Sequence, residues 1–289
     1  MFSIRTATMA DVPAIHQCWL DTDFTPEEQI PVKPLGIAPW FPNLVEHGDM
    51  RVAESAGAII GFAATVTRGR MQYLSECFVR PDWQSMGVTK ALLDALYTDP
   101  TLIRCTLASS DRRAVSRYMR VGMTPRWPMY ILDLVDPTKL DTPRYQATVC
   151  TDVAEWLHYD YRLVGHDRSI DITQYFIAAC DAALLQIHDG ARLVGQALVQ
   201  RRHYDPGAVG ARNIGPVGVF DRADAAHAVH AAVAWVVADG VSKVHLRVPA
   251  EHAALPWMIA RGMHIDAVET YCASQEWFDP TCYAPSGLM

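Results

Sequence analysis

The sequence feature that most constrains this chain is an internal repeat at an offset of about 140 residues. Three segments of the first half each resemble one segment of the second half, in the same order and with nearly the same spacing. The pairs are ATMADVPAI (7–15) with ATVCTDVAEW (147–156), AIIGFAATVTRG (58–69) with RLVGQALVQRRH (192–203), and DRRAVSRYMRVGM (111–123) with EHAALPWMIARGM (251–263). A duplicated unit of this length predicts two domains with the same fold.

The segment VDPTKLDTPRYQ lies between the two copies and is typical of a linker, because it contains two prolines and several charged residues. The boundary is therefore expected within residues 136–145, and we divide the chain into domains 1–138 and 139–289. A chain of 289 residues is long enough for two domains of ordinary size.

Each copy alternates predicted strands with predicted helices. In the first copy, strands are expected near 3–7, 51–55, 58–68, 71–80, 101–109 and 126–134, and helices from Thr8 or Asp11, from Gly87, and over 111–121. Residues 24–44 hold five prolines and several large apolar side chains, which indicates a shaped loop. The second copy repeats the order with a longer hairpin around 203–212. We expect an α/β fold (α+β, mixed sheet) with two mixed sheets and helices packed on them.

The stretch VRPDWQSMGVTKALLDAL (79–96) passes from a strand end into a helix that begins at a glycine. A helix N-terminus presents free backbone N–H groups and the positive end of the helix dipole, so it favours anions. Gly87 would let the backbone come close to a phosphate, and Gln84 could donate a hydrogen bond beside it. The alternative is a glycine that only eases a turn.

This stretch and the downstream DRRAVSRYMRVGM together resemble the Gcn5-related N-acetyltransferase (GNAT) superfamily. In that family the pattern V-x-P-x-x-Q/R-x-x-G-x-G/A, followed by a Leu-Leu helix, holds the pyrophosphate of an acyl-coenzyme A. Here it is matched by Val79, Pro81, Gln84, Gly87, Leu92 and Leu93, with Thr89 where the family prefers Gly or Ala. The second signature, N-x-x-A-x-x-x-Y-x-x-x-G-F, corresponds to Asp111, Ala114, Tyr118, Gly122 and Met123. The resemblance covers residues 3–134 and implies two tandem GNAT folds.

The resemblance also implies that acetyl-coenzyme A, or another acyl-coenzyme A, binds the first copy as a co-substrate without a metal. A backbone N–H within 77–79 is then expected to polarise the acyl carbonyl. The departures at Ser85, Met86 and Thr89 put the acyl preference in question. The cofactor-binding residues implied by the resemblance are Cys77, Phe78, Val79, Gln84, Ser85, Met86, Gly87, Val88, Thr89, Asp111 and Ala114.

Tyr118 and Glu76 are the candidate catalytic residues. The family places this tyrosine near the coenzyme sulfur, where its hydroxyl can protonate the departing thiolate; alternatively, Tyr118 packs under the cofactor. Glu76 is the only carboxylate on the strand expected at 72–80, and it could take the proton of the incoming amine. A surface or ion-paired glutamate, with a water chain acting as the base, is the alternative.

The second copy resembles, more faintly, the second GNAT-like domain of tandem bacterial acetyltransferases of the YitH/HolE type. At the positions of Gln84, Gly87 and Tyr118 it has Asp224, His227 and Met258. An acidic side chain repels a pyrophosphate, and a methionine cannot transfer a proton. We therefore expect this copy to be degenerate, with the fold retained and the chemistry lost.

The segment DTDFTPEEQIPVKPLGIAPWFPNL (21–44) is expected to build the acceptor pocket, as this region does across the family. The segment GHDRSIDITQYF (165–176) either contacts that pocket from the other domain or caps its own helix. Within 21–44, Asp21, Asp23, Glu27 and Glu28 could attract an amine, and Trp40 and Phe41 could form an apolar wall.

Charge and composition argue against several other classes of protein. A formal net charge of −7, without a concentrated basic face, argues against nucleic acid as a partner. No apolar run approaches the length of a membrane span and the N-terminus lacks a signal-peptide pattern, so a cytoplasmic protein without membrane contact is expected.

Cysteine and histidine spacing does not indicate a metal site. The seven cysteines are dispersed without a CxxC pair, which predicts reduced, mostly buried thiols, and Cys77 and Cys105 are interpreted as packing residues rather than acyl carriers. His227 and His230 lie one helical turn apart without an evident third ligand, so a solvated helix face is expected there.

The sequence therefore predicts an acyltransferase, an N-acetyltransferase in which the amine of a small molecule directly attacks an acetyl group carried by coenzyme A. Two alternatives stay open: a non-catalytic module that binds or senses acyl-coenzyme A, and a GNAT-like thioester decarboxylase. The identity of the acceptor and the formation of a homo-oligomer are not fixed by the sequence.

Overall fold

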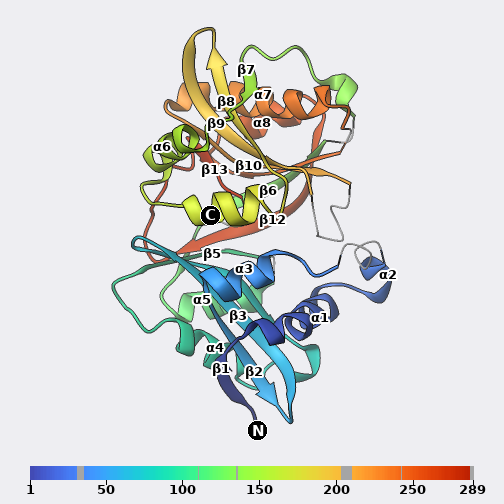
Figure 1. Cartoon of the computed structure of the whole chain (residues 1–289), viewed down its shortest axis with the longest axis vertical. Helices are drawn as coiled ribbons and strands as arrows, with labels where there is room; N and C mark the ends of the chain where they lie inside the picture. Colours follow the sequence, from blue (N-terminus) through green and yellow to red (C-terminus); the bar gives the residue numbers. More distant parts are fainter. Residues whose placement is uncertain (31–35, 110, 135, 203–209, 242, 287–289) are drawn as a thin grey trace.

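The computed structural model describes residues 1–30, 36–109, 111–134, 136–202, 210–241 and 243–286. Within these residues, thirteen strands form one continuous mixed sheet, with helices on both of its faces (Figure 1). The strand order is β1-β2-β3-β4-β5-β12-β6-β11-β10-β9-β8-β7, and β13 pairs with β10.

The first half has the strands that its sequence predicts, with ends that shift by one or two residues. Its helices are α1 (Val12–Asp23), α2 (Pro26–Gln29), α3 (Trp40–His47), α4 (Val88–Leu96) and α5 (Arg112–Arg120), with short 3₁₀ turns at Met9–Asp11 and Pro81–Trp83. The segment expected as a loop at 24–44 thus contains α2 and most of α3, and its residues 31–35 lie outside the described residues. The strands are β1 (Ser3–Thr6), β2 (Asp49–Ser55), β3 (Ala58–Arg68), β4 (Met71–Val79), β5 (Ile103–Ala108) and β6 (Thr124–Leu134).

The second half repeats this order of elements, which confirms the internal repeat. Its strands are β7 (Gln146–Val149), β8 (Ala183–Asp189), β9 (Arg192–Gln200), β10 (Arg212–Val219), β11 (Val244–Pro249), β12 (Met263–Ala273) and β13 (Tyr283–Ala284). Its helices are α6 (Val153–Val164), the π-helix η5 (Asp171–Ile177), α7 (Ala225–Ala238) and α8 (Ala254–Ile259), with a 3₁₀ turn at Arg222–Asp224 before α7. Most of the hairpin expected around 203–212 lies outside the described residues.

The two halves exchange their last strands. Strand β12, which ends the repeat in the second half, lies between β5 and β6 and pairs antiparallel with both. Strand β6, which ends the first half, pairs on its other edge with β11 of the second half. The expectation of two separate sheets is therefore wrong, because the final strand of each copy completes the sheet of the other.

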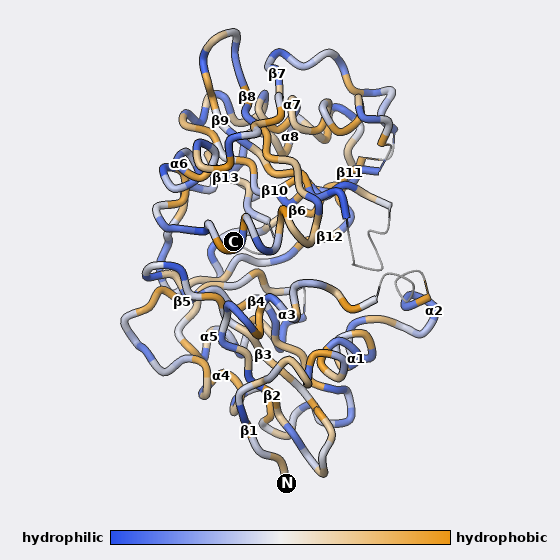
Figure 2. Tube along the Cα trace, viewed as in Figure 1, coloured by the Kyte–Doolittle hydropathy of each residue, from blue (hydrophilic) through white to orange (hydrophobic). Residues whose placement is uncertain are grey.

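Apolar side chains cover both faces of this sheet. Helices α4, α5, α7 and α8 pack on one face, which we call the α4/α7 face, and α7 is apolar along most of its length (Figure 2). Helices α1, α3, α6 and η5 pack on the opposite face, the α1/α6 face. No helix within the described ranges is long and apolar enough to cross a membrane.

Candidate functional site

The sheet opens between β4 and β5. These parallel strands pair over only three residues each, 71–73 with 103–105. Just beyond, the Thr106 hydroxyl donates a hydrogen bond to the Leu74 carbonyl at 2.8 Å. Strand β4 continues to Val79, so the peptide groups of its second half face the opening rather than a strand partner on that side.

A bulge in β4 lies at this opening. Leu74 pairs with Thr65 of β3 and Glu76 pairs with Ala64, so Ser75 is the extra residue. A bulge locally disrupts the ladder and changes the direction of the neighbouring side chains. Here it places Glu76 on the α1/α6 face.

A cavity of about 1070 Å³ passes through the opening and reaches both faces of the sheet. At one end it is lined by Gln84, Ser85 and Thr89, at the start of α4. At the other end it is lined by aromatic side chains of both halves, including Trp40 and Tyr175. The cavity is therefore built by the first half and closed by the second.

Gly87 takes a left-handed backbone conformation, with φ of +84°, immediately before α4. A Cβ atom added there would meet nothing within 4 Å, so the backbone conformation rather than crowding favours glycine. The side-chain amide of Gln84 donates to the Val79 carbonyl at 3.2 Å and accepts from Arg113 at 3.1 Å. As a result, the backbone N–H groups of the first turn of α4 lie next to the loop formed by residues 84–87.

The residues predicted to bind a cofactor occupy three kinds of environment. Met86 is exposed, Val88 is buried in the core under α4, and neither they nor Gly87 line the cavity with a side chain. Any contact from these three would therefore come from the backbone or from a surface methionine. The others line the cavity: Cys77, Phe78, Val79, Gln84, Ser85, Thr89, Asp111 and Ala114.

Arginine side chains of α5 were missed by the sequence interpretation. Arg112, Arg113, Arg117 and Arg120 all line the cavity near the start of α4. The spacing of three of them, at i, i+4 and i+7, places them on one helix face and was a usable signal. Guanidinium groups beside a helix N-terminus favour a ligand that carries phosphate groups.

Tyr118 of α5 is 8% exposed and lies against the sheet on the α4/α7 face, where it lines the cavity. Burial raises the pKa of its hydroxyl well above the ordinary value, and the neighbouring Cys77 adds to the effect. The Tyr118 hydroxyl is therefore protonated at neutral pH and can act only as a proton donor in its resting state.

Glu76 lines the same cavity from the α1/α6 face, and the Ser75 hydroxyl donates to its carboxylate at 3.5 Å. An ion pair of the second half, Arg247 with Glu269 at 2.9 Å, also lines the cavity. Tyr73, on the same face of β4, has a raised pKa because of burial and of the nearby Glu269 carboxylate. Charged groups of both halves thus meet at this end.

The cysteines are free thiols, and five of the seven are buried. Burial raises the pKa of both Cys77 and Cys105 to about 12. A thiol with such a pKa is not a thiolate at neutral pH, which agrees with the interpretation of these two residues as packing residues.

Part of the segment expected to build the acceptor pocket lines the cavity. Asp23 and Trp40 line the cavity. Phe41, expected in its wall, is instead fully buried, with its ring 5.7 Å from that of Phe62, because the turn of α3 directs it into the core. Glu28 caps α2 through Thr25, and neither it nor Glu27 lines the cavity.

The second half contributes to the pocket through the segment 165–176. Tyr175 and Phe176 of η5 line the cavity, so this segment reaches from the second half to the cavity that the first half also lines. The Arg68 guanidinium of β3 and the Asp171 carboxylate of η5 form a two-point ion pair, with a distance of 2.6 Å, which holds the two halves together beside the cavity.

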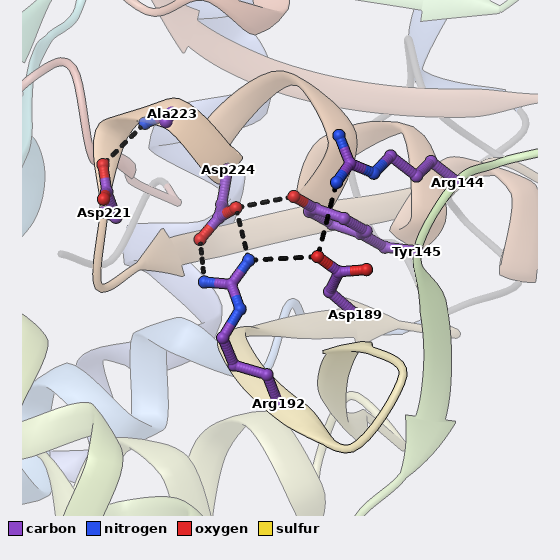
Figure 3. Close-up of polar contacts among 7 residues, drawn as sticks. All are labelled: Arg144, Tyr145, Asp189, Arg192, Asp221, Ala223 and Asp224. Carbon is purple, nitrogen blue, oxygen red and sulfur yellow. Dashed lines mark hydrogen bonds and ion pairs between the residues drawn. The ribbon is translucent and has the colours of Figure 1, made fainter.

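The corresponding strand–helix junction of the second half is filled by an ion-pair cluster (Figure 3). The Asp224 carboxylate accepts hydrogen bonds from the Tyr145 hydroxyl at 2.6 Å and from two nitrogens of Arg192 at 2.8 and 3.0 Å. Asp189 binds the same Arg192 guanidinium. His227, the counterpart of Gly87, lies inside α7, because this helix already begins at Ala225. No residue of this junction is among those that line the cavity in the described structure.

The sequence led us to expect His227 and His230 on a solvated helix face, and this expectation is wrong. His230 is 1% exposed and its ring nitrogen lies 3.1 Å from the Asp141 carbonyl oxygen, because the linker covers this side of α7. His227 packs between the rings of Tyr145 and Trp257. In the part of the chain that the structure describes, no group of three or more side chains could hold a metal ion.

Comparison with known proteins relates part of the first half to one family and the whole chain to several solved structures. The sequence profile of the Acetyltransferase (GNAT) domain matches residues 43–126. A candidate acetyltransferase from Pyrococcus horikoshii is similar over 99% of this chain and 95% of its own, with 14% identity and a TM-score of 0.73. No curated protein matches the chain significantly.

Two further solved structures have the same fold at low sequence identity. A GCN5-related N-acetyltransferase from Sphaerobacter thermophilus aligns over 97% of this chain and 98% of its own, with 17% identity and a TM-score of 0.59. A tandem GNAT protein from the clavulanic acid biosynthesis pathway aligns over 96% of this chain and 99% of its own, with 13% identity and a TM-score of 0.61. At these identities the similarity establishes the fold.

Proposed function

We propose that this chain transfers an acetyl group from acetyl-coenzyme A to the amine of a small molecule. The match of residues 43–126 to an acetyltransferase (GNAT) domain and the tandem GNAT fold of the chain support this proposal. The observation that carries this proposal is the single cavity that joins the start of α4 to the α1/α6 face through the β4–β5 opening. An elongated anionic thioester and a second, smaller substrate can enter such a cavity from its two ends.

The start of α4 and the arginines of α5 would hold the phosphate groups of the coenzyme. The free N–H groups at Val88 and Thr89, with the Thr89 hydroxyl, are suited to the pyrophosphate, and Gln84 and Ser85 lie beside them. Arg117 and Arg120 supply positive charge along the same end of the cavity. On β4, the backbone of residues 77–79 would polarise the thioester carbonyl.

Glu76 and Tyr118 are assigned the two proton transfers. Glu76 accepts a proton from the acceptor ammonium, directly or through water, so that the amine nitrogen can attack the thioester carbon. A C–N bond forms, the C–S bond breaks, and the Tyr118 hydroxyl gives its proton to the departing thiolate. The nitrogen loses its second proton through water to the Tyr118 oxygen, and Glu76 releases the proton it accepted to solvent. The positions of the two residues on opposite faces of β4, in one cavity, support this division of roles.

Acetyl-coenzyme A titration by calorimetry and amine-dependent thiol release test the proposal together. We expect the wild type to bind acetyl-coenzyme A, and Tyr118→Phe to retain this affinity while turnover falls about 100-fold, since a positioned acid contributes at least that factor. Tyr97→Phe is the matched control, because Tyr97 lies in the same core but does not line the cavity.

Other outcomes would change the assignment. Absence of acetyl-coenzyme A binding would reject the proposal, and binding without amine-dependent thiol release would support a module that only binds the coenzyme. Full activity of the Tyr118→Phe enzyme would remove Tyr118 from the mechanism.

A further inference from the structure

Two amide side chains of the second half face the cavity from neighbouring strands. Gln200 ends β9 and Asn213 lies near the start of β10, and the two residues are direct partners in the antiparallel register. Direct partners project to the same face of a sheet. Both line the cavity although each residue is only 6% exposed.

No hydrogen bond joins either side-chain amide to another residue in the described part of the chain, and neither amide is among the fully buried polar groups that lack a partner, so both are open to the cavity. An amide group has two N–H donors and a carbonyl acceptor. Two neighbouring amides that line a cavity and are not engaged by the protein are available to bind a polar ligand.

Gln196, on the same strand as Gln200, differs from it in its hydrogen bonding. Gln196 lies four residues before Gln200 on the same face of β9 and is 2% exposed. Its amide can donate to the Trp156 carbonyl at 3.2 Å and accept from the Asp160 N–H at 3.1 Å, both in α6. Gln196 is satisfied by the protein itself, whereas Gln200, beyond the end of α6, reaches the cavity.

Charged and aromatic groups next to the two amides complete this wall. Arg247 of β11 is paired with Glu269 of β12, and Arg202, two residues after Gln200, adds a guanidinium group that also lines the cavity. Tyr175 and Phe176 provide an aromatic surface beside the amides. A ligand that satisfies Gln200 and Asn213 in this setting must itself carry groups that donate and accept hydrogen bonds.

We propose that Gln200 and Asn213 form the acceptor-recognition wall of the cavity, and that the acceptor is an amine whose body carries hydrogen-bonding groups, such as hydroxyl or amide, rather than an alkyl chain. This inference rests on the proposed function for the identity of the reacting amine. The second half then determines which acceptor enters the site of the first half.

Matched pairs of amines test the wall by direct binding, independently of turnover. Glycinamide is compared with isobutylamine, and 2-aminopropane-1,3-diol with 3-aminopentane, so that each polar amine has an alkyl analogue of similar shape. Binding is measured by saturation-transfer NMR on the full-length protein, with and without coenzyme A. We expect at least one polar amine to bind about tenfold more tightly than its analogue, and Gln200→Leu and Asn213→Leu to abolish that preference.

Gln196→Leu is the control for loss of a buried amide away from the cavity. It should lower the unfolding midpoint and keep the preference for the polar amine. If both leucine variants at the wall keep the preference while folded, or if the wild type does not discriminate within either pair, the proposed wall is rejected. A preference for the polar amine without acetyl transfer would support the recognition wall and reject the proposed function. Acetyl transfer to both members of each pair with equal KM would support the proposed function and reject the recognition wall.

Discussion

In the first half the chain leaves β4 and enters α4 through Gly87, whereas in the second half it leaves β10 and enters α7 through Asp224. The left-handed glycine delays the helix until Val88 and leaves the loop before it open to the cavity. Without such a glycine, α7 begins earlier in the repeat, and its first residues occupy the corresponding space. The residue at which the helix begins thus distinguishes an open junction from a filled one within the same fold.

The charges at the two junctions also differ. At the first junction, Arg117 and Arg120 of α5 line the cavity and form no ion pair in the described part of the chain, so their positive charge is available to a ligand. In the second, Arg192 is held by Asp224 and Asp189. The guanidinium lowers the pKa of the Asp224 carboxyl, mainly through its hydrogen bonds. The positive charge of Arg192 at the second junction is therefore neutralised by carboxylates of the protein itself.

A negative charge introduced at the open junction should have the largest effect on coenzyme binding. In Gly87→Glu, a carboxylate lies beside the site proposed for the pyrophosphate, and two like charges about 4 Å apart repel by about 4 kcal/mol near a protein surface. We expect the dissociation constant of acetyl-coenzyme A, measured by calorimetry, to rise at least about 100-fold.

The matched change in the second half is His227→Glu, which should leave this dissociation constant unchanged. Gly87→Asn separates strain from charge, because asparagine tolerates the left-handed conformation and adds no charge. If Gly87→Glu and Gly87→Asn weaken acetyl-coenzyme A binding equally, charge is not the cause of the lower affinity.

Neutralisation of Asp224 should lower stability rather than affinity. Asp224→Asn removes the charge that binds Arg192 in a site that is 4% exposed, and we expect the free energy of unfolding at pH 7 to fall by about 1–2 kcal/mol. Because the folded-state pKa of Asp224 is lowered, its contribution is present above the unfolded pKa of about 4 and is lost as the pH falls through the folded value.

Urea unfolding of both proteins at pH 7 and near pH 3 measures this difference. The gap between wild type and Asp224→Asn should narrow at the lower pH, with acetyl-coenzyme A affinity at pH 7 the same for both proteins. A gap that is equally large at both pH values would indicate that the ion pair is not its source.

The smallest effect is expected from a single hydroxyl at the open junction. Thr89→Val keeps the shape of the side chain and removes one hydrogen-bonding group, so acetyl-coenzyme A should bind about fivefold more weakly, with no change in the unfolding midpoint. Val229, its counterpart in the second half, belongs to α7 and is fully buried in the core. Val229→Ala should therefore show the opposite pattern, with a lower midpoint and unchanged affinity.

Local patterns were sufficient to predict much of the fold. The bounds of β3 agree with the sequence, and α4 begins where Gly87 and the apolar stripe place it, because strand alternation, helical periodicity and glycine conformation all act over a few residues. The partners of the strands were not predictable in this way. Nothing in the local pattern of β12 distinguishes pairing with β5 from pairing with a strand of its own half.

The candidate site shows the same limit. Asp23 and Trp40 line the cavity, whereas Phe41, the residue after Trp40, is buried in the core. The orientation of α3 determines which of the two aromatic side chains faces the cavity. The burial of His230 depends on the linker residue Asp141, which is distant in sequence. The roles proposed for Tyr118 and Glu76 stay predictions until the variants are measured.

The exchange of last strands has a consequence for synthesis on the ribosome. Strand β5 lacks its antiparallel partner until β12 has been made, as the hydrogen bond between Arg104 and Ser274, 170 residues apart, illustrates. During this interval the nascent first half has an exposed sheet edge, which is a template for wrong pairing. The half that contains the cavity therefore completes its sheet only after nearly all of the other half has been translated, and a pause or truncation before β12 leaves both halves unfinished.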